Sequence, residues 1–368
     1  MTAGSDPEVI SDLTAPEGAM PPRPVAQPAV LVTSVPQLGE TEAAHLARDR
    51  FGILGRMVRL SSERDSNFHV TAEDGRAFVL KVSNAAEHPA ITNFQTAALR
   101  HIEARAPGLP VPLVCPTVDG DDEVAVTLKA GTQHVVRLLT YLDGEPLYRV
   151  VQSLPQAANL GRCLASIGLA LRDFRHPAAD HDLLWDLKGA ARLRPLLSHV
   201  TEACRALATR GLDHFEAEIA PRLAGLRRQV VHNDLNPHNV LVHPADPARV
   251  TGVLDFGDMV NTHLVNDVAV AAAYQVGCPD MLCQIATFVG AYHAVSPLEA
   301  DEVDVLVGLI GLRQIMTLAI AGWRASLYPE NRAYILRNEP PAAAALERLA
   351  AIGRPAILSR LRAACELE

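Results

Sequence analysis

The sequence predicts an α+β fold of two lobes, a small β-rich N-terminal lobe and a larger, mostly helical C-terminal lobe. Alternating apolar residues, typical of strands, mark the part of the chain from about residue 37 to residue 142. Apolar residues at helical spacing dominate the part after residue 143, and only brief apolar runs between residues 230 and 254 interrupt them. The length of 368 residues suits two such units.

Three segments are expected along the chain. Seven of the 26 prolines lie in residues 1–36, which predicts a flexible tail without a role in the chemistry. The N-terminal lobe then covers residues 37–142, and the C-terminal lobe covers residues 143–368.

In the N-terminal lobe, the apolar pattern predicts short elements that alternate between helix and strand. Two strands joined by a turn at residues 73–75 form a hairpin, and Lys81 lies on the face of the second strand opposite Leu80. The expected elements are a helix over 41–51, strands over 67–71 and 77–83, a helix through Phe94 and Ile102, and a strand over 135–142.

In the C-terminal lobe, helices are expected over residues 160–174, 187–197, 201–209, 264–275, 281–293, 299–327 and 342–349. The longest is as apolar as a membrane span, but it contains Asp304, Arg313 and Gln314. A charge at mid-bilayer costs about 2.5–3.5 kcal/mol. We therefore expect a buried helix of a soluble protein.

Composition excludes several classes of protein. The net charge of −9 argues against a general nucleic-acid binder or a binder of anionic membranes, so neither partner is expected. The six cysteines include no Cys-x-x-Cys pair, so neither a disulfide framework nor a zinc finger is indicated. The first twenty residues are acidic and hold no apolar signal-peptide core. A reducing, cytoplasmic location is expected.

Two polar segments carry the chemistry. His232, Asp234 and Asn239 lie in a loop between two short strands, and Asp255 follows a third strand directly, before Phe-Gly. Oxygens of Asn239 and Asp255 could bind Mg²⁺ together with phosphate oxygens. Asp234 could accept the proton of a substrate hydroxyl, and Lys81 could neutralise charge on nucleotide phosphates. The pattern indicates phosphoryl transfer.

With its His-x-Asp-x₄-Asn and Asp-Phe-Gly motifs, the chain resembles the aminoglycoside phosphotransferase/choline kinase-like superfamily, a branch of the protein-kinase-like fold. The resemblance runs from about Gly39 to about Leu349 and includes residues 61–70, 78–83 and 137–144. Among the subgroups, the chain is most similar to the hydroxylysine kinase group.

The resemblance implies a small-molecule kinase that uses Mg²⁺ and ATP or GTP. Its acceptor would be a hydroxyl group of a hydroxy-amino acid or an amino alcohol, and so would carry an amine. Kinases of homoserine, choline, a sugar or an aminoglycoside stay open as alternatives, as does a catalytically silent, nucleotide-binding regulator. The choice between ATP and GTP and the oligomeric state also stay open.

The resemblance also implies roles for individual residues. Asp234 is the catalytic base or hydroxyl-orienting residue, Lys81 contacts the phosphates, and Asn239 and Asp255 bind Mg²⁺. His232 and Asp267 support the catalytic loop. The implied nucleotide contacts are Ser66, Asn67, Lys81, Gln95, Tyr141 and Leu142, and the candidate acceptor contacts are Asn236, Asp258 and Arg313.

The sequence departs from the family pattern at three places. Asn236 stands where the family often has His. Asn233 stands where the family often has Gly, which requires either a negative φ or a conformation that Asn tolerates. Gln95 stands where a Glu usually pairs with the phosphate-binding Lys. Lys81 is then held less tightly or by another carboxylate, unless Gln95 is an ordinary surface residue of its helix. Arg313 and Asp258 could also be structural.

Overall fold

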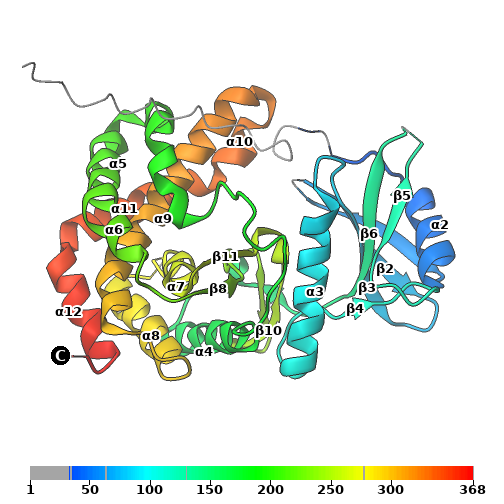
Figure 1. Cartoon of the computed structure of the whole chain (residues 1–368), viewed down its shortest axis with the longest axis horizontal. Helices are drawn as coiled ribbons and strands as arrows, with labels where there is room; N and C mark the ends of the chain where they lie inside the picture. The colour runs from blue at the N-terminus through cyan, green and yellow to red at the C-terminus, as the bar shows by residue number, and fades with distance from the viewer. Residues whose placement is uncertain (1–32, 34, 63, 130, 277, 368) are drawn as a thin grey trace, which may run out of the picture.

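The computed structural model describes residues 33, 35–62, 64–129, 131–276 and 278–367. A β-sheet lobe and a larger helical lobe lie side by side (Figure 1), which confirms the predicted fold class. Apart from residues 33, 35 and 36, the predicted N-terminal tail lies outside the described residues.

The N-terminal lobe contains one antiparallel sheet in the order β1-β2-β3-β6-β4, with β5 paired to β6. The predicted hairpin is confirmed as β2 and β3, and Gly75 in its turn has a φ of 85°. The strand expected to reach residue 142 ends at Thr140. The strands are β1 Gly55–Leu60, β2 Ser66–Ala72, β3 Ala77–Val82, β4 Val114–Cys115, β5 Val124–Thr127 and β6 Gln133–Thr140.

Two helices flank this sheet and belong to different cores. Helix α2 (Glu40–Phe51) buries Ala43 and Ala47 in the core of the N-terminal lobe. Helix α3 (Pro89–Arg105) lies between the sheet and the helical lobe in Figure 1. Its Phe94 and Ile102 join the large core of the C-terminal lobe, so α3 ties the two lobes together.

Most predicted helices of the C-terminal lobe are confirmed. The segment after Leu187 differs, because it forms a 3-10 helix, η2, which contains Pro195. Proline lacks the amide hydrogen that an α-helix uses at this point. The helix expected over 160–174 ends at Ala170 and the one over 264–275 ends at Ala272. In the described part of this lobe, the helices of eight or more residues are α4 Leu154–Ala170, η2 Leu187–His199, α5 Glu202–His214, α7 Leu264–Ala272, α8 Met281–His293, α9 Ala300–Leu327, α11 Glu339–Ile352 and α12 Arg354–Ala364.

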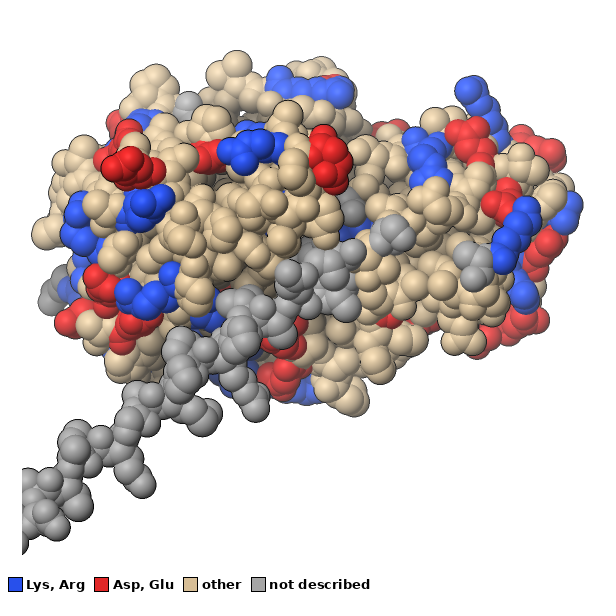
Figure 2. All heavy atoms as spheres, turned by 90° about the horizontal axis from the view of Figure 1, so that it is seen from above, with Lys and Arg blue, Asp and Glu red and all other residues tan. Residues whose placement is uncertain are grey.

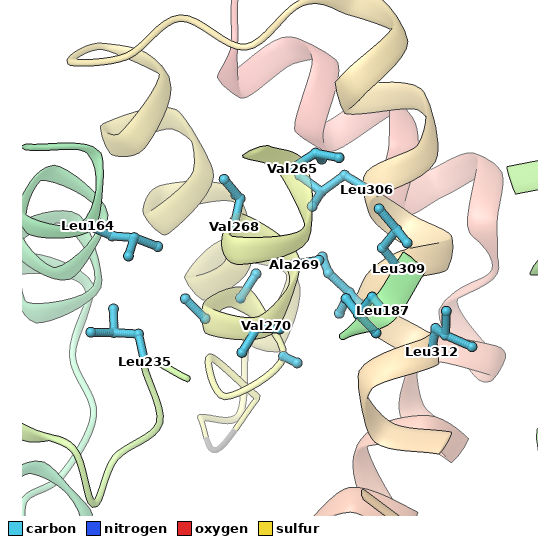
Figure 3. Close-up of a cluster of buried hydrophobic side chains, with 14 of the residues drawn as sticks. Leu164, Leu187, Leu235, Val265, Val268, Ala269, Val270, Leu306, Leu309 and Leu312 are labelled. Atoms are coloured by element: carbon cyan, nitrogen blue, oxygen red, sulfur yellow. The ribbon is translucent and has the colours of Figure 1, made fainter. Parts of the chain in front are cut away.

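Helices α7 and α9 form the centre of this lobe. Every residue of α7 is buried, and Figure 3 shows Val265 and Val268 of α7 among leucines of α4, η2 and α9. By length and composition alone, α9 could cross a membrane. However, 83% of its apolar window is buried inside the protein, in agreement with the expected core helix. On the face in Figure 2, charged residues of both signs are interspersed.

Two small antiparallel sheets hold the polar segments singled out in the sequence. Strand β9 (Val240–His243) pairs with β10 (Asp246–Val253) and with β7 (Glu145–Pro146). Strand β8 (Arg228–Val231) pairs with β11 (Val260–His263). The His232–Asn239 loop therefore connects two sheets, and Asp255 follows the end of β10.

Candidate active site

Two adjoining cavities lie at the junction of the lobes. The larger, of about 490 Å³, is lined by Lys81 and Gln95 from the N-terminal lobe and by Asn239 and Asp255 from the C-terminal lobe. The smaller, of about 120 Å³, is lined by Trp185, Asp234, Asp258 and Arg313 among others. Arg64 and Arg337 line both cavities. The larger cavity thus holds predicted phosphate-site residues, and the smaller one holds the acceptor candidates Asp258 and Arg313.

A buried histidine fixes the start of the catalytic loop. His232 is fully buried and packs edge-on against Phe256. Its Nε2 lies 3.0 Å from the carbonyl oxygen of Leu254, and its Nδ1 accepts the amide hydrogen of Asp234 at 3.2 Å. Nε2 must therefore carry the hydrogen. Burial lowers the pKa of His232, which keeps the ring neutral. These contacts suit the bracing role implied by the family.

The next residue adopts a backbone conformation that few residues tolerate. Asn233 has a φ of 64°, so the expectation of a conformation that Asn can adopt is confirmed. Its amide donates to Oδ1 of Asp267 at 2.7 Å. Burial raises the pKa of Asp267 to about 7. The α7 carboxyl therefore holds the turn that directs Asp234 into the smaller cavity.

Three side chains orient the carboxylate of Asp234. Its Oδ2 accepts hydrogen bonds from Asn239 Nδ2 at 2.8 Å and Asn236 Nδ2 at 2.9 Å. Its Oδ1 accepts from Arg313 Nη2 at 3.1 Å. Burial raises the pKa of Asp234 to about 7, although the charge of Arg313 opposes that shift. Asn236 therefore contacts Asp234 directly, and Arg313 belongs to the site.

Asn239 and Asp255 fit a divalent cation. The amide of Leu254 donates to the carbonyl oxygen of Asn239 at 2.7 Å, which places the two residues at neighbouring strand ends. Because Asn239 Nδ2 donates to Asp234, its Oδ1 is directed away from that carboxylate. Among the described residues, no group of three or more His, Cys, Asp or Glu could hold a metal. Two oxygen ligands suit Mg²⁺, which usually keeps water and phosphate ligands.

Charges across the lobe junction keep Asp255 ionised. Its Oδ1 lies 3.9 Å from Lys81 Nζ and accepts the amide hydrogen of Gly257 at 3.2 Å. Desolvation between the lobes acts to raise the pKa of Asp255. Lys81 and Arg64 outweigh that effect and hold the pKa below its usual value.

A carboxylate from the β1–β2 loop lies beside Lys81. This agrees with the expectation that a carboxylate other than the usual helix glutamate holds Lys81. Lys81 Nζ is 4.0 Å from Oδ2 of Asp65. Gln95 is only 6% exposed, so the surface interpretation of this residue is wrong. Its Oε1 accepts a hydrogen bond at 3.0 Å from Arg137, the residue opposite Lys81 in the β3–β6 pair. The side-chain oxygen of Gln95, which stands where the family usually has Glu, is thus hydrogen-bonded to a buried arginine and not to Lys81.

Other implied nucleotide contacts do not all reach the larger cavity. Asn67 lines it, but Ser66 is fully buried and donates its hydroxyl hydrogen to the carbonyl oxygen of Pro36. Tyr141 is 39% exposed and packs edge-on against His69. Neither Tyr141 nor Leu142 is among the residues that line the larger cavity. Ser66 therefore does not line the phosphate site, and the implied place of Tyr141 and Leu142 at the edge of the nucleotide base stays a prediction.

Sequence reasoning assigned no individual role to Arg64, Asp65 or Arg137, which all line the larger cavity, although Arg64 and Asp65 lie in the segment 61–67 that the resemblance implies holds the nucleotide phosphates. Arg137 carries a signal of its own, because it is the one charged residue of the apolar strand over 135–142. Arg64 and Asp65 carry none, because loop polarity does not reveal which residues face a ligand.

Comparisons with known proteins agree with this geometry. Residues 56–293 match the model of the phosphotransferase enzyme family, APH. Hydroxylysine kinase of Mus musculus is 29% identical over 348 residues, which cover 88% of this chain and 92% of the mouse protein. Homoserine kinase of Methylobacillus flagellatus is 28% identical over 267 residues, which cover 68% of this chain and 74% of that protein.

Solved structures show the same fold. A microcompartment-associated aminopropanol kinase has a TM-score of 0.67 and 21% identity, covering 84% of this chain and 97% of that one. The amicoumacin kinase hAmiN, solved with AMP-PNP, Ca²⁺ and Ami, has a TM-score of 0.63 and 15% identity, covering 88% of this chain and 94% of that one. Because the family model matches residues 56–293, more than half of the chain, this chain belongs to the phosphotransferase enzyme family.

Proposed function

We propose that this protein is a kinase that transfers the γ-phosphoryl group of ATP or GTP to the side-chain hydroxyl of a hydroxy-amino acid, with 5-hydroxylysine as the first candidate. One observation carries the proposal. Asp234 lines the smaller cavity and is hydrogen-bonded at 2.8 Å to Asn239, which lines the larger one. This contact couples a proton acceptor on one side to a phosphate-binding space on the other. The mouse relative supplies the candidate acceptor.

In the proposed reaction, the larger cavity holds the nucleotide phosphates and the smaller one holds the acceptor. Asp234 accepts the hydroxyl proton as the acceptor oxygen bonds to the γ-phosphorus. The bond from that phosphorus to the β,γ-bridging oxygen breaks, and its electron pair leaves with the nucleoside diphosphate. Mg²⁺, held by Asn239 and Asp255, would neutralise phosphate charge. Lys81 would bind the α- and β-phosphates, and positioning would supply most of the acceleration.

The charges of the smaller cavity support an acceptor with a carboxylate group. Four arginines line it, against two carboxylates, Asp234 and Asp258; the arginines are Arg64, Arg313, Arg324 and Arg337. Arg313 is 4% exposed and lies over the ring of Trp185 at 4.7 Å. Its Nε and Nη1 are buried without a protein partner. These two nitrogens do not share one edge of the guanidinium, so each offers a single hydrogen bond, and the positive charge of the group suits a carboxylate. Choline and aminoglycosides, which lack one, fit this lining less well.

We further propose that the acceptor also carries an amine and that the enzyme works in the cytoplasm. An ammonium group in the smaller cavity would meet its two carboxylates, of which Asp258 is the candidate contact. All six cysteines are described by the structure, and each is a free thiol. Free thiols are typical of a reducing compartment.

The first experiment measures nucleoside diphosphate release with Mg²⁺ and either ATP or GTP. The acceptor panel contains 5-hydroxylysine, homoserine, choline, 1-amino-2-propanol, glucose and kanamycin. We expect stimulation by 5-hydroxylysine and a much weaker response to 1,5-diaminopentan-2-ol, its analogue without the carboxylate. Stimulation by choline or kanamycin instead would contradict the carboxylate argument while leaving the kinase in place.

Two variants test the proposed division of labour. Asp234→Ala should retain nucleotide binding and lower kcat by about 10²–10⁴-fold, the usual contribution of a positioned proton acceptor. Asp255→Ala should lose the Mg²⁺-dependent part of nucleotide binding, which titration calorimetry measures without turnover. Equal loss of binding in both variants would contradict the assigned roles. Binding of nucleotide and Mg²⁺ without turnover on any acceptor would favour the silent regulator.

A further inference from the structure

Arg64 reaches both cavities from a loop that is anchored at its base. The loop connects β1 to β2, and the carbonyl oxygen of Arg64 accepts a hydrogen bond from Asn84 Nδ2 at 3.0 Å. The side chain of the next residue contacts the same asparagine, because Oδ1 of Asp65 accepts the backbone amide hydrogen of Asn84 at 3.0 Å. These contacts fix the backbone from which the guanidinium extends across the lobe junction.

The guanidinium lies beside the residues expected to hold the metal and the acceptor. Arg64 Nη2 donates to Oδ1 of Asp258 at 2.9 Å, although the two residues are 194 positions apart. A Cβ atom added to Gly257 would lie 3.2 Å from Arg64 Nη2 and 2.9 Å from Oδ1 of Asp255. Gly257 is thus flanked by the guanidinium and the Asp255 carboxylate. A glycine there lets the cation approach the anion without a side chain between them.

The cations of the site are divided between different places. Lys81 lies beside Asp65 and Asp255 and lines the larger cavity only. Arg313 contacts Asp234 and lines the smaller cavity only. Arg64 lines both. A phosphoryl group that passes from one cavity to the other must cross the space between them, where Arg64 lies.

We propose that Arg64 is a catalytic residue that donates hydrogen bonds to the non-bridging oxygens of the phosphoryl group during transfer, and that Asp258 positions its guanidinium. This inference rests on the proposed function. Negative charge on those oxygens is spread in the transition state, and a guanidinium fork can bind two of them at once. Asp258 would then be a positioning residue, whether or not it also meets an acceptor amine.

The kinetic test compares Arg64→Ala and Arg64→Lys with the wild type, using ATP, Mg²⁺ and 5-hydroxylysine. An arginine that contacts the phosphoryl group in the transition state raises kcat by about 10³-fold or more. We expect a loss of that size in Arg64→Ala with little change in the Kd for Mg²⁺ and AMP-PNP. Guanidine added to the solution should restore part of the rate in Arg64→Ala alone. The kcat of Arg64→Lys should lie between those of the wild type and Arg64→Ala, because lysine keeps the positive charge but lacks the two parallel donors of a guanidinium. Asp258→Asn, which can still accept the hydrogen bond but holds the guanidinium without a charge, should lower kcat by up to about 10²-fold.

A matched control is Arg76→Ala, which removes an exposed arginine at the β2–β3 turn, far along the same lobe. It should leave kcat unchanged. If instead Arg64→Ala and Asp258→Asn lower thermal stability equally and kcat stays near that of the wild type, the pair only joins the lobes and the inference is overturned.

A second measurement needs no acceptor and so separates this inference from the proposed function. ADP with Mg²⁺ and aluminium fluoride imitates the phosphoryl group in flight. In the wild type, fluoride and aluminium should tighten ADP binding, and Arg64→Ala should lose that gain while it binds ADP and Mg²⁺ normally. An undiminished gain in Arg64→Ala overturns the role of Arg64. Absence of turnover on the acceptor panel, with the gain present and dependent on Arg64, overturns the acceptor assignment alone.

Discussion

At the scale of the residue, Asn233 shows how a strained backbone serves the site. It is fully buried with a φ of 64°, and its backbone amide donates a hydrogen bond to Asp267. Asn233→Gly removes the left-handed strain, whereas Asn233→Ala increases it by about 1–2 kcal/mol. In urea denaturation, we expect the free energy of unfolding of Asn233→Gly to exceed that of Asn233→Ala by at least that margin. Equal stabilities would show that the turn relaxes when the side chain is lost.

Asp267 predicts a pH dependence of stability. Burial raises its pKa to about 7, so the folded protein keeps a proton that the unfolded chain releases near pH 4. Its stabilising contribution is present below about pH 4 and is lost as the pH rises to about 7. The difference amounts to at most about 4 kcal/mol. Asp267→Asn is neutral throughout and keeps an acceptor, so its unfolding free energy should fall less over this range. Parallel curves for the two proteins would contradict the shift.

The sequence was sufficient for those site residues that lie within one motif. His232, Asp234 and Asn239 lie close together because one short loop between β8 and β9 holds all three. The contact between Arg64 and Asp258 joins residues 194 positions apart, and no local pattern encodes it. The same limit applies to Asp65, whose position beside Lys81 depends on how the β1–β2 loop folds over the sheet. The motif predicts the chemistry, and the tertiary fold decides which charges assist it.

At the scale of the element, the packing of α4 against α8 depends on Gly161. A Cβ at this position would lie 2.3 Å from the carbonyl oxygen of Phe288 and 3.0 Å from the amide of Tyr292. Gly161→Ala should therefore force the helices apart and destabilise the protein by about 1–3 kcal/mol. Gly311 in α9 is the matched control, because a Cβ there would meet nothing within 4 Å. Gly311→Ala should stabilise by about 0.5–1 kcal/mol. Losses of equal size in both variants would contradict the close approach.

Elements with a strong apolar period were predictable, and those without one were not. Helix α8 has the predicted limits, because Met281, Ile285 and Phe288 repeat at helical spacing. Strand β1 was not predicted, because Met57 is its only buried residue and its apolar residues do not alternate with polar ones. The two-residue strand β4 is too short for any period to appear.

At the scale of the whole molecule, the two lobes have separate cores that meet at α3 and at the cavities. The core around Phe68 and Leu80 belongs to the sheet lobe, and the large helical core includes Phe94 of α3. Direct polar contacts across the junction include Arg64 with Asp258 and Lys81 with Asp255. A ligand in the larger cavity touches both lobes at once, and its binding energy should stabilise them together.

This coupling predicts the calorimetric behaviour of the whole chain. At a hundredfold excess over its Kd, AMP-PNP with Mg²⁺ should stabilise the native state by about 2.7 kcal/mol. Because Lys81 and Asp255 come from different lobes, the two lobes should unfold in one transition at a higher temperature when the ligand is bound. EDTA should remove most of the shift, since Asp255 contributes through the metal. In Lys81→Ala the shift should shrink while Mg²⁺ dependence stays. Two transitions, of which only one responds to nucleotide, would mean that the ligand is held by a single lobe and that the junction does not close around it.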